Sequence, residues 1–162
     1  MGRLKILAVV VAAMVAPNPM FVSAQTPAGQ SQATQPLLDP NTAAEKELAS
    51  VPHITPAIAK SITAKRPFAT IVELDTLLKE QKLTQEQLAE VHGRMFVRLN
   101  LNTASDEEIL AIPGIGKRML HEFKEYRPYK SMEQFRREIG KYIDRDKREA
   151  ELARLERYVM IK

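Results

Sequence analysis

Residues 112–118 read Ile-Pro-Gly-Ile-Gly-Lys-Arg, and this stretch is the strongest local signal in the chain. Two glycines one residue apart favour a tight turn, because glycine adopts positive φ and lets another backbone approach closely. Lys117 then begins a predicted helix, whose first amides have no partner inside the helix. Free amides at a helix N-terminus beside basic side chains are typical of an anion site, and phosphate is the expected ligand. The alternative is a packing turn with solvated basic residues.

The chain matches itself at an offset of 61 residues. Residues 41–68 align without a gap with residues 102–129, including Asn-Thr-Ala, the proline of the turn and an Arg-Pro-aromatic corner. We therefore expect two modules of about 60 residues each, at 38–99 and 100–162. In the first copy the turn reads Val-Pro-His-Ile-Thr-Pro-Ala at 51–57, so both glycines and both basic residues are missing.

The local signals within both copies are helical. Ser or Thr stands three residues before Glu or Gln, the capping-box pattern, at Thr42, Thr70, Thr84, Ser105 and Ser131. Apolar residues recur at helical spacing, and no alternating run of β-branched residues indicates a strand. The predicted helices lie at 43–50, 56–65, 71–80 and 85–96 in the first copy and at 105–111, 117–126, 132–140 and 146–158 in the second. The predicted fold class is therefore all-α.

The first 37 residues are expected to lie outside this fold. Residues 1–24 have a short basic start, an apolar run and a final Val-Ser-Ala, which together predict a signal peptide cleaved before Gln25. A retained membrane anchor is the alternative, but the apolar run is short for a bilayer. Residues 25–37 contain no charge and have the composition of a flexible linker. We therefore expect an exported protein, either periplasmic or secreted.

Composition argues against several kinds of site. The chain has no cysteine, which excludes disulfides, thiolate metal sites and cysteine nucleophiles. His53, His92 and His121 lie far apart and lack carboxylates at ligand spacing, so we expect no metal and no cofactor. Asp144 and Asp146 are expected at the start of a helix, since no further domain is available to form a pocket for a base. We therefore expect neither an enzyme nor a small-molecule substrate.

The two copies differ in charge. Residues 38–99 carry eight Lys or Arg and eight Asp or Glu, whereas residues 100–162 carry fourteen and twelve. A net charge of +2 in the second copy is small for a nucleic-acid-binding protein. However, seven of its basic residues are clustered: Lys117, Arg118, Lys124, Arg127, Lys130, Arg136 and Arg137. Part of this run lies in a mixed-charge segment typical of a solvated helix face.

Four short motifs of the second copy occur together: Asn-Thr-Ala-Ser at 102–105, Glu-Ile at 108–109, Ile-Pro-Gly-Ile-Gly at 112–116 and Tyr-Lys-Ser at 129–131. In this combination the copy resembles the helix-hairpin-helix (HhH) domain of ComEA-type competence proteins, and the first copy resembles it more weakly. The resemblance implies tandem (HhH)2-like modules that bind double-stranded DNA through its phosphates, without sequence preference. It implies that the DNA phosphate-binding residues are Gly114, Ile115, Gly116, Lys117, Arg118 and Lys124.

The chain departs from that family at three of four expected hairpins. The regions 81–84 and 140–144 lack the Gly-hydrophobic-Gly pattern, as does the turn at 51–57. Two functions therefore stay open. The first is an exported, non-enzymatic DNA-binding module of the competence type. The second is a structural subunit of an extracytoplasmic complex, similar to PsbU of photosystem II or to parts of secretion machinery, with a protein partner bound through residues 38–99.

Overall fold

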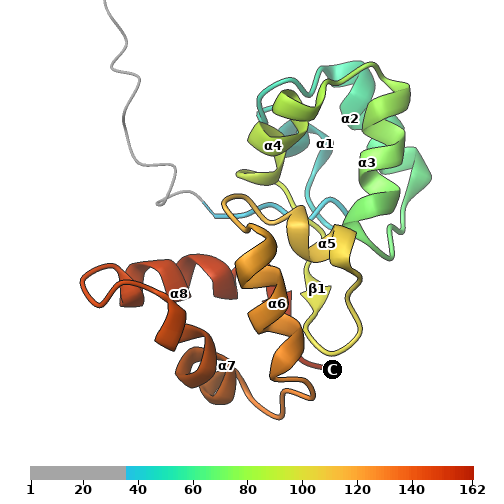
Figure 1. The fold of residues 1–162 in the computed structure, drawn as a ribbon. Coiled ribbons are helices and arrows are strands. Elements are labelled where there is room, and N and C mark those ends of the chain that lie inside the picture. The colour runs from blue at the N-terminus through green and yellow to red at the C-terminus, as the bar shows by residue number, and fades with distance from the viewer. Residues whose placement is uncertain (1–35) are drawn as a thin grey trace, which may run out of the picture. The chain divides into compact units, whose positions relative to one another are not determined.

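The computed structural model describes residues 36–162 (Figure 1). The expected signal peptide at 1–24 and all but the last two residues of the expected linker at 25–37 lie outside the described residues. The described part of the chain forms eight α-helices and two strands of two residues each, so the predicted all-α fold class is confirmed. None of these helices has the length and apolar character needed to cross a membrane.

The first copy contains four helices. They are α1 (Glu45–Leu48), α2 (Pro56–Lys65), α3 (Ile71–Glu80) and α4 (Gln85–His92). Thr55, Thr70 and Thr84 precede α2, α3 and α4, and each side chain accepts a hydrogen bond from the amide three residues later. Such caps satisfy amides that the helix itself leaves unpaired, which fixes where each helix begins.

The prediction that Thr42 caps the first helix is wrong. The N-cap position of α1 is Ala44, whose amide donates to the Glu47 carboxylate at 2.7 Å. The second copy has Ser105 at the equivalent position, where both halves of the capping box form. The first copy has therefore kept only the glutamate half of this motif.

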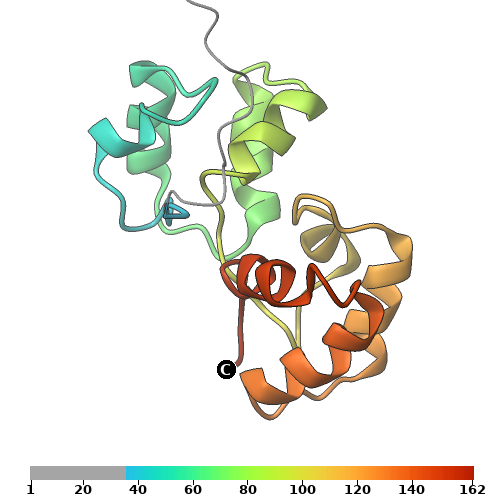
Figure 2. The same ribbon diagram turned by 90° about the vertical axis from the view of Figure 1, so that its left-hand side faces the viewer.

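The second copy repeats the arrangement (Figure 2). Its elements are α5 (Asp106–Leu110), α6 (Lys117–Glu125), α7 (Met132–Ile139), the 3₁₀-helix η2 (Gly140–Tyr142) and α8 (Arg148–Glu156). Ser105 and Ser131 cap α5 and α7 through their hydroxyls. Gly116 is the N-cap residue of α6 and has no side chain that could accept such a bond.

A short parallel pairing closes each copy. β1 (Leu99–Asn100) pairs with β2 (Val159–Met160), and Leu38 forms the equivalent bridge with Met95 in the first copy. The expectation that no strand forms is therefore wrong, because these segments are too short to show an alternating pattern. The same pairings explain why α4 and α8 end before the predicted residues 96 and 158. After each helix the backbone pairs with the segment at the start of the same copy and is no longer helical.

An asparagine holds the Arg-Pro-aromatic corner of each copy. The Asn41 side chain donates to the Phe68 carbonyl at 2.9 Å and accepts from the Phe68 amide at 2.7 Å. Asn102 forms the same two bonds with Tyr129, at 3.0 and 2.7 Å. The repeated asparagine and the aromatic residue after Arg-Pro are thus parts of one structural clamp.

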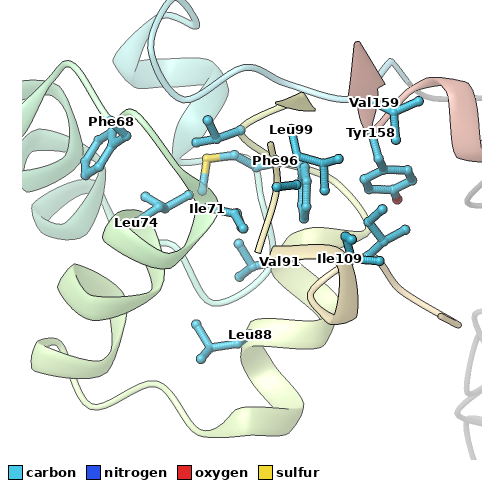
Figure 3. Packing of buried hydrophobic residues seen from close by; sticks show 14 of the residues in the cluster. Phe68, Ile71, Leu74, Leu88, Val91, Phe96, Leu99, Ile109, Tyr158 and Val159 are labelled. Atoms are coloured by element: carbon cyan, nitrogen blue, oxygen red, sulfur yellow. The ribbon is translucent and has the colours of Figure 1, made fainter. Parts of the chain in front are cut away.

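The buried side chains of both copies form one hydrophobic cluster (Figure 3). Where the copies meet, the Phe96 ring packs edge-on against the Tyr158 ring, with the centroids 4.9 Å apart. Leu99 and Val159 lie beside this pair and join the two ends of the second copy. Phe68, Tyr129 and Tyr158 are all buried.

Candidate nucleic-acid interface

The turn before α6 is closed by its own backbone. Gly114 adopts a φ of 82°, in the left-handed region that glycine accepts most readily. The Ile115 amide donates to the Ile112 carbonyl at 3.1 Å. The resemblance assigns Ile115 to the phosphate site, and its amide is held by this bond within the turn.

The available donors lie in the first turn of α6. The first bond within this helix runs from the Leu120 amide to the Gly116 carbonyl, at 3.0 Å. The amides of Lys117, Arg118 and Met119 therefore have no backbone partner within residues 36–162. A Cβ built on Gly116 would meet no atom within 4 Å apart from its chain neighbours, so the space beside the residue that precedes these amides is open. Three unpaired donors thus adjoin an open position at the positive end of a helix dipole.

The predicted basic residues differ in their surroundings. Lys117 is exposed, and no ion pair involves it in the described part of the chain. Arg118 is also exposed, and its guanidinium lies 6.0 Å from the centroid of the Tyr142 ring. Lys124 lies further along α6 and donates to the Asp106 carboxylate at 2.6 Å. Lys117 and Arg118 therefore adjoin the free amides, whereas the charge of Lys124 is offset by its partner.

Arg154 of α8 also contacts this turn, although the sequence did not indicate it. Its Nη1 donates to the Pro113 carbonyl at 2.7 Å, and its Nη2 lies 2.6 Å from Oε1 of Glu151. The same Nη2 would lie 3.6 Å from a Cβ on Gly114. The hydrogen bond from Arg154 lowers the pKa of the Glu151 carboxyl below its usual value, so this ion pair persists at neutral pH.

The equivalent turn in the first copy keeps the backbone path but has lost most of the donors. His53 takes the left-handed position with a φ of 65°. The Thr55 hydroxyl accepts from the Ile58 amide at 3.3 Å, and Pro56 has no amide hydrogen. Of the three amides in the first turn of α2, only that of Ala57 is left for a ligand.

Each of the three histidines contacts a carboxylate. The sequence predicted no carboxylates at ligand spacing, and this is wrong, because folding joins two of the histidines to residues distant in sequence and the third pair lies a single helical turn apart. The pairs are His53–Glu90 at 2.8 Å, His92–Asp75 at 2.7 Å and His121–Glu125 at 3.1 Å. Nowhere in residues 36–162 do three His, Asp or Glu side chains meet in a way that could hold a metal ion.

Residues 34–96 match the family model of the helix-hairpin-helix motif. The match covers the first copy, whose turn has lost the glycines but whose helices, threonine caps of α2 to α4 and Asn41 clamp remain. No curated protein and no solved structure matches the chain.

Proposed function

We propose that this protein is an exported, non-enzymatic DNA-binding module that holds the phosphate backbone of double-stranded DNA at its second hairpin. The observation that carries the proposal is the set of three amides, at Lys117, Arg118 and Met119, that face an open approach beside Gly116. A phosphate fits such a helix N-terminus because free N–H groups and the helix dipole both favour an anion. Contacts of this kind carry no sequence information, so binding is independent of sequence.

The helix-hairpin-helix match supports the proposal, since this motif is generally nucleic-acid-binding. The resemblance to ComEA-type proteins suggests the finer role of holding incoming DNA outside the inner membrane. This role requires export, which the signal-peptide pattern of residues 1–24 favours. Mass spectrometry of the exported protein should give Gln25 as the first residue. An exported chain that still carries residues 1–24 would reject cleavage at this position.

A second candidate function is contact with a protein partner through residues 38–99. It is favoured by the loss of phosphate donors at Thr55 and Pro56, which leaves the first hairpin without the chemistry of the second. In a mixed arrangement, the second copy holds DNA while the first copy binds protein.

The proposed function is tested by titrating two unrelated duplexes of equal length with the purified protein. Binding is measured by fluorescence anisotropy. We expect equal affinities and a slope of about −2 to −4 in a plot of log K against log salt, because two to four phosphates are engaged. A folded protein that binds neither duplex at low salt would reject the proposal.

A matched pair of substitutions then locates the interface. Lys117→Glu places a negative charge beside the free amides and should weaken binding at low salt strongly. Lys60→Glu makes the same change in net charge on α2 of the first copy, where Lys60 is exposed. Equal losses for the two variants would show that binding follows net charge and is not centred on the second hairpin.

A further inference from the structure

The last helix of each copy places one charged side chain against the hairpin of that copy. In the second copy this residue is Arg154 of α8, which holds the Pro113 carbonyl. The equivalent residue of α4, 64 positions earlier, is Glu90. Its carboxylate lies 2.8 Å from Nε2 of His53, the left-handed residue of the first turn. Equivalent positions of the two last helices thus contact their hairpins with side chains of opposite charge, Arg154 through a backbone carbonyl and Glu90 through an imidazole.

The surroundings of the two side chains make this difference larger. Arg154 and Glu151 form an ion pair with no net charge. The pair therefore does not offset the positive charge at the start of the neighbouring helix α6. The partner of Glu90 is His53, and the neutral residue Gln87 stands at the position of Glu151 and approaches Nδ1 of His53 at 3.5 Å. The Glu90 side chain is 59% exposed, so its negative charge faces the solvent in front of the first hairpin.

We infer that this position of the last helix determines whether a hairpin accepts an anion. Glu90 excludes phosphate from the first hairpin by like-charge repulsion, in addition to the loss of amide donors there. Arg154 is a positioning residue: it holds the turn through Pro113, and its ion pair with Glu151 leaves no net negative charge beside Gly114. This inference rests on the proposed function and adds the residue that separates the two hairpins.

Substitutions at Arg154 distinguish an effect of its charge on DNA binding from an effect of its support of the turn. In the purified full-length protein, Arg154→Glu should bind duplex DNA about tenfold more weakly than Arg154→Gln at low salt. The difference should shrink at high salt, because screening weakens the repulsion. Arg154→Lys keeps the charge but loses the paired bonds to Glu151, so it should bind duplex DNA more tightly than Arg154→Gln and less tightly than wild type. A residue that only supports the turn would give equal losses for Gln and Glu at every salt concentration, which would overturn the inference.

Substitutions at Glu90 provide the complementary test on an exposed side chain, where folding is not at risk. Glu90→Lys should tighten duplex binding about three- to tenfold at low salt, because it removes a repelling charge and adds an attracting one. The control is Glu80→Lys, which makes the same change in net charge beside Lys65, the residue that ends α2. Equal gains for both variants would overturn the inference. Failure of the wild-type protein to bind DNA would instead reject the proposed function.

Discussion

Gly116→Ala separates the ligand-binding role of the second hairpin from a role in packing. Gly116 has a φ of −109° and a ψ of 178°, which any residue adopts, and an added Cβ would meet no described atom within 4 Å. The free energy of unfolding should therefore stay the same or rise by about 0.4–1 kcal/mol, since alanine restricts the unfolded chain. The new methyl group would stand where a phosphate must approach the α6 amides. Loss of one charge-assisted hydrogen bond of about 1.5–3 kcal/mol corresponds to roughly 10- to 150-fold weaker binding.

Urea denaturation measures the effect of Gly116→Ala on stability, and fluorescence anisotropy with a random duplex measures its effect on DNA affinity. Gly114→Ala is the matched control, because Gly114 has a φ of 82°. It should lower the free energy of unfolding by about 1–2 kcal/mol, the cost of a left-handed conformation for a residue with a Cβ. Duplex binding by Gly116→Ala as tight as that of the wild type would reject the phosphate site, and the turn would then be a packing element.

Three further predictions concern stability and can all be measured by urea denaturation. Asn102→Ala removes two hydrogen bonds to Tyr129 and should lower the free energy of unfolding by about 2–3 kcal/mol; an unchanged value would contradict the clamp. His92→Ala leaves the buried Asp75 carboxylate without its partner and should cost about 3 kcal/mol, with a smaller loss when Asp75 is also replaced. The pKa of Glu151 is lowered in the folded state, so its contribution is present at neutral pH and is lost as pH falls below the ordinary value of 4.5. Glu151→Gln should therefore reduce the acid sensitivity of the protein, and an identical pH profile would refute this.

Local sequence patterns predicted most of the helices because their determinants are local. The bounds 56–65 and 71–80 agree with α2 and α3 at both ends, since prolines, caps and apolar spacing define them. The ends of α4 and α8 were predicted two to four residues too late. Their ends depend on parallel pairing with a segment at the start of the same copy, and such a long-range contact leaves no periodic signal.

The candidate site was predictable to the extent that its parts are adjacent in sequence. Gly116 and the amides of Lys117 and Arg118 belong to one short turn. Met119 contributes only a backbone amide, so its apolar side chain gave no signal. Arg154 is 41 residues away from Pro113, and only a comparison of the last helices of the two copies relates it to the hairpin.

We propose that free amides at the start of α6 hold phosphate, and an NMR titration of isotope-labelled protein with a short random duplex tests this contact. The backbone amide signals of Lys117, Arg118 and Met119 should shift and saturate together, while those of Ala57 and Ile58 stay in place. Duplex binding that leaves the three α6 amides unshifted, or that shifts the first hairpin instead, would rule out phosphate binding at this helix start.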